Sequence, residues 1–185
     1  MELSRTAYVI LGMIKLGRRT GYEIKALVDV SARFFWAVSY GQIYPELKRL
    51  EEWGLIEGEH DSSDGRRRRV FSLTADGEEV LRQWLTSSEP LVNEMRHEGV
   101  LKFFFADALS REEQIELLRR VREEHERLAE SLRSIEVLAR AKRDEEGLEQ
   151  PQRTAEWGVA LNEFNAEWCA RLERQLAEET KATGG

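Results

Sequence analysis

The second half of the chain carries an apolar stripe that fits one continuous α-helix. From Ile115 to Leu138, apolar residues and one histidine, His125, recur at spacings of three and four, after a capping box that begins at Ser110. A helix from there to about residue 143 is roughly 50 Å long at 1.5 Å per residue. A small lone domain cannot cover such a helix, so the stripe predicts an apolar seam that needs a partner.

A second stripe predicts that this helix folds back on another of similar length. After a predicted turn over residues 144–151, apolar residues at helical spacing run from Trp157 to Leu176. We expect an antiparallel pair whose apolar seams meet a second copy of the chain. Seven residues are predicted to carry this homodimer contact: Leu128, Leu132, Ile135, Leu161, Phe164, Trp168 and Leu172.

The first half of the chain has the element order of a winged helix-turn-helix. Ser4 is expected to cap a first helix, and Thr20 to Glu23 form a predicted capping box for a second. Ile43, Leu47 and Leu50 predict the buried face of a third helix over about 40–53. The remaining predicted elements are a strand at 55–60, a hairpin turn at 61–65, a return strand at 67–73 and a helix capped by Thr74.

Together these patterns predict a mainly α fold with a small two-stranded β-wing. The segment Ser87 to Pro90 separates the two kinds of pattern. We therefore expect a winged helix-turn-helix domain over 1–86 and a helical dimerisation or effector domain over 87–185.

Pro45 conflicts with a regular third helix. A proline deep in a helix removes a backbone hydrogen bond and kinks the helix. Two alternatives follow from the sequence: a distorted first turn, or a regular helix that begins at Tyr44 with Pro45 as its first residue.

The charge of the chain is unevenly distributed. Residues 1–85 hold 13 Lys/Arg and 13 Asp/Glu, so the whole net charge of −7 belongs to residues 86–185. Within the neutral half, Arg66 to Arg69 form an unbroken basic run. Because nucleic-acid affinity depends on local basic surface more than on net charge, DNA binding is compatible with this acidic chain.

The winged-helix order indicates which residues would contact double-stranded DNA. The third helix would enter the major groove, and the hairpin would offer cations to phosphate. On an ideal strand, Arg67 and Arg69 share the inward side of Phe71, and Arg66 and Arg68 point the other way. The predicted DNA contacts are Tyr22 at the start of the second helix, then Gly41, Gln42, Tyr44, Lys48 and Arg49, and Arg66, Arg67, Arg68 and Arg69 in the wing.

At these residues the sequence resembles the PadR family of bacterial transcriptional regulators. The Tyr44-Pro45 pair followed by Leu47 and Leu50 is the most specific mark. The segments that carry the resemblance are Gly21-Tyr22-Glu23-Ile24, Tyr40 to Glu51, Gly54-Leu55-Ile56, Arg67 to Thr74 with Gly77, and, more loosely, Leu101 to Phe105 with the two long helices. One departure is Phe71, where the family often has tyrosine.

The resemblance implies a homodimer that binds a pseudo-palindromic operator, usually as a repressor. It also implies that a small effector, aromatic or other, or a cellular signal releases the DNA. Two-fold symmetry would set the two third helices roughly 34 Å apart.

Other interpretations of the same residues compete with this one. The acidic helices could make the chain a winged-helix scaffold for protein partners, but the basic third helix and wing favour DNA. Trp157 and Trp168 could stack on an aromatic effector, although aromatic stripes more often serve packing. Cys169, next to Trp168 on the last predicted helix, could sense redox state through thiolate chemistry, but this interpretation is disfavoured.

The sequence predicts neither an enzyme nor a metal or cofactor site. His60, His97 and His125 lack metal-ligand spacing, and no catalytic grouping appears. The absence of a long apolar run and of a leader, with a single cysteine, predicts a cytoplasmic protein that does not enter membranes.

Overall fold

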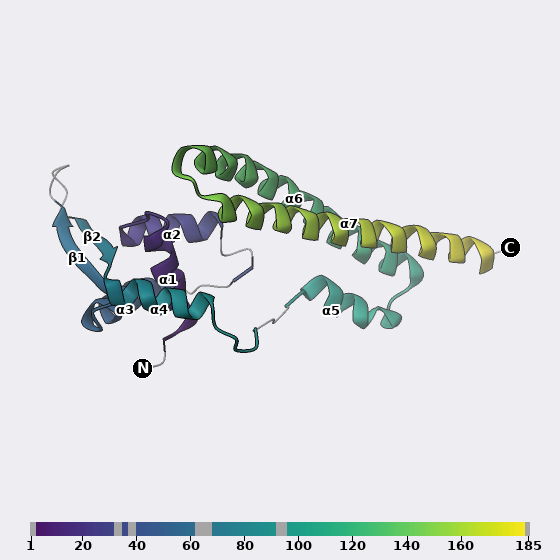
Figure 1. The fold of residues 1–185 in the computed structure, drawn as a ribbon. Coiled ribbons are helices and arrows are strands. Elements are labelled where there is room, and N and C mark those ends of the chain that lie inside the picture. Colours follow the sequence, from purple (N-terminus) through teal and green to yellow (C-terminus); the bar gives the residue numbers. More distant parts are fainter. Residues whose placement is uncertain (1–2, 32–34, 37–39, 62–67, 92–95, 184–185) are drawn as a thin grey trace. The chain divides into compact units, whose positions relative to one another are not determined.

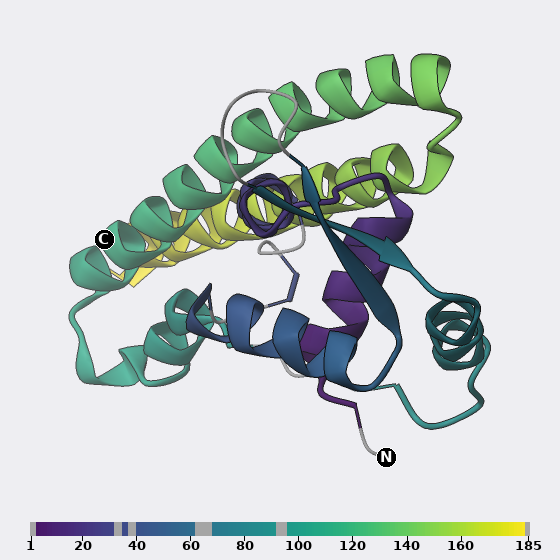
Figure 2. The same cartoon turned by 90° about the vertical axis from the view of Figure 1, so that its left-hand side faces the viewer.

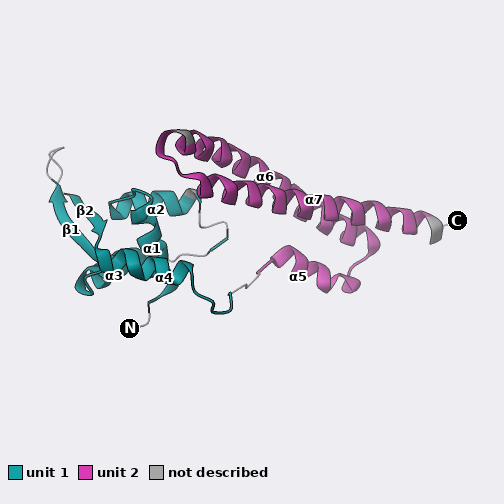
Figure 3. Cartoon of the chain, viewed as in Figure 1, with its two compact units in different colours: residues 1–91 teal, residues 92–185 magenta. Residues whose placement is uncertain are grey.

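The computed structural model describes residues 3–31, 35–36, 40–61, 68–91 and 96–183 of the chain. The chain divides into two compact units, residues 1–91 and 92–185 (Figure 3). Each unit is described by itself.

Unit 1 has the predicted winged helix-turn-helix order (Figure 1). The Ser4 hydroxyl caps the first helix by accepting the Ala7 N–H, and Thr20 and Glu23 form the predicted capping box. The elements are α1 (Arg5–Lys15), α2 (Gly21–Val30), α3 (Tyr40–Glu52), β1 (Ile56–Asp61), β2 (Arg68–Leu73) and α4 (Ala75–Leu85).

The two strands form an antiparallel hairpin with a continuous register. Ile56 pairs with Leu73, and Asp61 pairs with Arg68. The predicted turn at 61–65 lies almost wholly outside the described residues. Phe71 is buried on the inner face of β2, as the strand alternation predicted.

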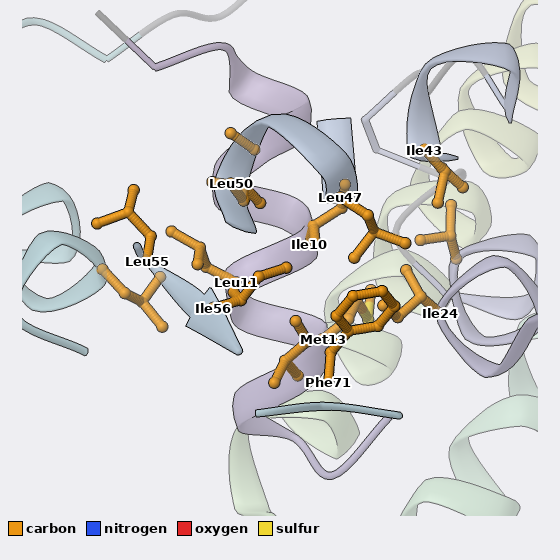
Figure 4. Close-up of a cluster of buried hydrophobic side chains, with 14 residues drawn as sticks. Ile10, Leu11, Met13, Ile24, Ile43, Leu47, Leu50, Leu55, Ile56 and Phe71 are labelled. Atoms are coloured by element: carbon orange, nitrogen blue, oxygen red, sulfur yellow. The ribbon is translucent and has the colours of Figure 1, made fainter. Parts of the chain in front are cut away.

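A cluster of buried hydrophobic side chains holds unit 1 together (Figure 4). Ile10 and Leu11 of α1 pack among Ile43, Leu47 and Leu50 of α3, which are at most 2% exposed. The prediction that these three residues form the buried face of α3 is therefore confirmed.

Pro45 lies inside α3, because this helix already begins at Tyr40. The alternative in which the helix begins at Tyr44 is wrong. Proline has no N–H to donate to the Gly41 carbonyl, but this side of the helix is exposed, so water can satisfy that carbonyl.

Helices are the only regular elements among the described residues of unit 2, and two long antiparallel helices make up most of it. The helices α6 and α7 lie side by side in both views (Figures 1 and 2), so the predicted antiparallel pair is confirmed. The predicted turn at 144–151 shortens to Gly147 and Leu148, and Gly147 has a φ of 71° that ends α6. The elements are α5 (Glu98–Phe104), a 3-10 turn (Ala106–Ala108), α6 (Arg111–Glu146) and α7 (Glu149–Thr183).

The contact between α6 and α7 uses small side chains. Ala155, Ala166 and Cys169 of α7 are buried, and Gly158 lies against Leu132 of α6. Burial raises the pKa of the Cys169 thiol, which opposes the thiolate chemistry of a redox sensor. Two residues of the predicted apolar stripe of α7 remain exposed: Trp157 is 54% and Phe164 is 60% exposed. Trp168 of the same stripe is partly buried and meets the Phe103 ring edge-on, with 5.8 Å between the ring centroids.

A chain of hydrogen bonds ties the start of α5 to this hairpin. His97 Nδ1 accepts the Val100 N–H at 3.1 Å, and His97 Nε2 lies 2.7 Å from His125 Nε2. His125 Nδ1 lies 2.7 Å from Asn162 Oδ1, and Asn162 Nδ2 donates to the Gly158 carbonyl at 2.8 Å. Every donor meets an acceptor only when His97 carries its proton on Nε2, His125 carries its proton on Nδ1 and both rings are neutral.

None of the described helices combines the length and the apolar composition that crossing a bilayer requires.

Gly77 provides the first test of this fold. A Cβ atom at this position would lie 1.9 Å from the carbonyl oxygen of Leu55, the residue before β1, so α4 and this segment would have to separate. We expect Gly77→Ala to lower the free energy of unfolding by about 3 kcal/mol, measured by urea titration with circular dichroism. The matched control is Gly12→Ala in α1, where a Cβ atom would meet nothing within 4 Å beyond the adjacent residues and the backbone of its own helix, and alanine favours the helix. Equal stability of the two variants would contradict this packing.

The histidine chain predicts a dependence of stability on pH. Burial and the neighbouring His125 ring lower the pKa of His97. An unfolded histidine has a pKa of about 6.5. Below that pH the unfolded chain binds a proton at His97, whereas the folded chain binds it only at lower pH. The free energy of unfolding of unit 2 should therefore be highest above this pH and fall as the pH drops from about 8 to 5.5.

The variant His97→Ala isolates this effect. Its free energy of unfolding should be about 1 kcal/mol lower than that of the wild type at about pH 8, because the helix cap is missing. This free energy should also depend less on pH than in the wild type. The exposed His60 on β1 is the control, because His60→Ala should keep the wild-type pH profile. A flat wild-type profile would contradict the neutral pair.

Candidate nucleic-acid interface

The outer face of α3 presents polar side chains opposite its buried face. Gly41, Gln42, Tyr44, Lys48 and Arg49 are all exposed, with Tyr44 at 62%. This exposure follows from the 3.6-residue period, since the aliphatic residues occupy the other side of the helix. The five predicted contacts on α3 therefore share one accessible surface.

Neighbouring groups restrain several of these side chains. The Arg49 guanidinium lies 4.2 Å from the Trp53 ring centroid, and Lys48 Nζ lies 3.6 Å from a carboxylate oxygen of Glu52. The Thr6 hydroxyl lies 3.5 Å from Gln42 Oε1. Exposed pairs of this kind contribute little to stability, so these side chains are oriented without being locked.

The start of α2 brings a second group of side chains to this surface. Tyr22 is 76% exposed. Gly21 permits a close approach, because a Cβ atom there would lie 2.7 Å from Tyr44 Cε1. Partial burial opposes ionisation of Glu23, but other groups outweigh it and lower the pKa of this carboxyl. The main ones are hydrogen bonds from the backbone amides of Thr20 and Arg19, and smaller contributions come from the Thr20 hydroxyl and the Arg68 charge. The capping carboxylate is therefore held ionised.

The wing contributes two described arginines, and both form ion pairs. Arg68 Nη2 lies 3.0 Å from a carboxylate oxygen of Asp61, its cross-strand partner. The Arg69 guanidinium pairs with Glu51 at the end of α3. The Arg69 guanidinium also lies 5.8 Å from the Phe71 ring centroid, so Arg69 shares the side of β2 with Phe71, as the strand alternation predicted. Arg66 and Arg67 lie outside the described residues.

These elements surround one groove of about 900 Å³. Its lining joins Tyr22, Tyr44, Lys48, Arg68 and Arg69, which come from three separate elements. The other predicted contacts on α3, Gly41, Gln42 and Arg49, are exposed outside this lining. The groove thus combines a helix N-terminus, an exposed helix face and wing cations, which suits a polyanion with a grooved surface.

Sequence patterns did not reveal the acidic part of the groove. Glu23 and Glu51 line it together with the basic residues. Glu51 follows Leu47 by four residues, so the helical period already places it on the flank of the buried face. Its ion pair with Arg69 depends on how the hairpin packs against α3, which no local pattern specifies.

Across the described ranges, no group of three or more His, Cys, Asp or Glu side chains has a metal-binding arrangement.

Comparison with known proteins gives separate matches for the two halves of the chain. The family described as "Transcriptional regulator PadR-like family" matches residues 10–83, and "Virulence activator alpha C-term" matches residues 95–177. The negative transcriptional regulator PadR of Bacillus subtilis (strain 168) is 32% identical over 113 residues, which are 60% of this chain and 62% of that protein. The matched region thus spans less than two thirds of this relative.

Solved structures share the fold at lower sequence identity. The crystal structure of Bacillus subtilis PadR in complex with operator DNA is similar with a TM-score of 0.83 and 24% identity, over 95% of this chain and 99% of that chain. The crystal structure of Bacillus subtilis PadR in complex with p-coumaric acid is similar with a TM-score of 0.71 and 22% identity, over 92% and 97% of the two chains.

Proposed function

Because this chain belongs to the PadR-like family of transcriptional regulators, we propose that it binds double-stranded operator DNA as a homodimer and regulates transcription as a repressor. The observation that carries the proposal is the groove of unit 1, where exposed tyrosine, lysine and arginine side chains from α2, α3 and β2 converge.

The surface divides into groups that read bases and groups that bind the backbone. A helix fits the major groove, which is about 12 Å wide and displays the base edges. Gln42, Lys48 and Arg49 lie on the exposed face of α3 and supply the donors and acceptors that base edges recognise. Tyr22 and the wing arginines, Arg66 to Arg69, are proposed to bind phosphate, which fixes the register without reading sequence.

Unit 2 is proposed to hold the two copies together. Trp157 and Phe164 on α7 and Phe104 on α5 are more than half exposed, and burying such large apolar side chains against a second copy would favour association. Among the seven predicted dimer residues, Leu132 is 4% exposed and already packs within its own chain. The proposed contact therefore falls mainly on Leu128, Ile135, Leu161, Phe164, Trp168 and Leu172.

The direction of regulation is inferred from the relatives. The Bacillus subtilis protein is a negative transcriptional regulator, and its fold has been solved with p-coumaric acid. By analogy, we propose repression that a small aromatic effector relieves. The DNA-binding role is assigned to residues 1–86, and the dimerisation and effector roles to residues 87–185.

Replacing Arg66 to Arg69 with alanine tests the wing. Wild-type protein would first select duplexes of about 30 bp, which hold two half-sites one helical turn apart, from a random-sequence pool. The quadruple variant should bind every selected duplex more weakly, and the slope of log K against log salt should decrease by roughly 1 for each lost phosphate contact. Gln42→Ala should instead change the selected sequence. Unchanged affinity of the quadruple variant, measured by fluorescence anisotropy, would refute the wing assignment.

Phe164→Glu tests the proposed dimer. A charge on this exposed apolar position should cost little within one chain but oppose a buried contact between two. We expect the wild type to sediment as a dimer at about 10 μM, in the range that specific interfaces reach, and Phe164→Glu to shift towards monomer. Glu167→Gln, an exposed residue of the same helix, is the control. A monomeric wild type would contradict the proposal.

A further inference from the structure

One carboxylate connects α3 to both strands of the wing. Glu51 Oε1 accepts the Gly58 backbone N–H from β1 at 3.2 Å, and the same oxygen pairs with the Arg69 guanidinium of β2. The Glu51 side chain is 25% exposed, so the pair is partly shielded from water. A single oxygen atom therefore joins the helix proposed to enter the major groove to the hairpin proposed to bind phosphate.

Gly58 leaves the space in which this pair forms. A Cβ atom at this position would lie 2.6 Å from Arg69 Nε, 2.7 Å from Glu51 Oε1 and 2.9 Å from Phe71 Cε1. The absent side chain thus lets the carboxylate and the guanidinium meet over the strand. This close packing gives the contact a fixed place in the fold, unlike the exposed pairs along α6 and α7.

The position of Glu51 is unexpected for a surface that binds a polyanion. Glu51 and Arg69 both line the groove of unit 1, where a carboxylate repels phosphate. Long-range electrostatics alone would therefore make Glu51 unfavourable for DNA binding. Its short-range effect has the opposite sign, because a charge-assisted hydrogen bond orients an arginine that would otherwise sample many rotamers.

We propose that Glu51 is a positioning residue for DNA binding, which holds Arg69 and the wing in the orientation that meets the phosphate backbone. The inference rests on the proposed function, because it assumes that the groove of unit 1 binds DNA. Orienting the cation before DNA arrives lowers the entropy lost on binding. The preorganised arrangement outweighs the repulsion, so the protein binds DNA more tightly with this negative charge than without it.

The test is Glu51→Gln, which keeps the size of the side chain and removes its charge. We expect Kd for the selected duplex to rise by about 3- to 10-fold, the effect of one misplaced charged contact. The salt slope should decrease by about 1, because Arg69 no longer meets its phosphate. The matched control is Glu57→Gln, which removes the same charge from an exposed position on β1. It should bind DNA as tightly as the wild type or more tightly, with an unchanged slope.

Arg69→Ala and the double variant separate positioning from general damage to the fold. If Glu51 acts through Arg69, adding Glu51→Gln to Arg69→Ala should cause no further loss of affinity. All variants are compared as full chains at a temperature where circular dichroism shows each to be folded.

Three results would overturn the inference, and they differ from one another. Equal or tighter binding by Glu51→Gln would show that the carboxylate competes with phosphate for Arg69. Independent losses in the double variant would show that Glu51 does not act through Arg69. A wild-type protein that selects no duplex would refute the proposed function itself, and the inference with it.

Discussion

The packing of α3 against α1 determines what the rest of unit 1 can present to a partner. Ile43, Leu47 and Leu50 occupy one side of the helix and are almost fully buried against the aliphatic residues of α1. A helix that buries this side must expose the opposite one, because its side chains recur every 3.6 residues. The hairpin then packs against the end of the same helix, which brings the wing to the border of the exposed face.

The electrostatic potential at the groove of unit 1 depends on how its charged side chains are arranged and only weakly on the total charge of the unit. Residues 1–85 are neutral by count, yet Lys48, Arg68 and Arg69 line one groove. Carboxylates lie among these cations: Asp61 pairs with Arg68 and Glu51 pairs with Arg69. Such pairs weaken the local field but order the side chains, so the geometry of the cations matters as much as their number.

Unit 2 separates two kinds of packing on the same helices. Small residues such as Ala155, Gly158 and Ala166 let α6 and α7 approach closely within one chain. Large residues such as Trp157 and Phe164 remain exposed beside that contact. This division supports the proposed dimer, because α6 and α7 pair within one chain while Trp157 and Phe164 stay accessible to a second copy.

Local sequence patterns were enough to predict the helix caps at Ser4 and Thr20, the antiparallel hairpin and the exposed face of α3. Those features depend on hydrogen bonds between near neighbours and on side-chain periods that a single segment displays. The capping box at Thr20 and Glu23 and the burial of Phe71 are examples that the structure confirms. The course of α3 through Pro45 was left open, since local propensity argues against a helix that packing on α1 enforces.

Contacts between residues far apart in the chain follow from the way the elements pack together, which local patterns do not specify. The pairing of Glu51 with Arg69 and the chain from His97 to Asn162 join separate elements. So does the choice of the small-residue face of α7 for contact with α6. Each of these contacts depends on how one element is rotated and shifted against another. The periodicity of a single segment determines neither the rotation nor the shift.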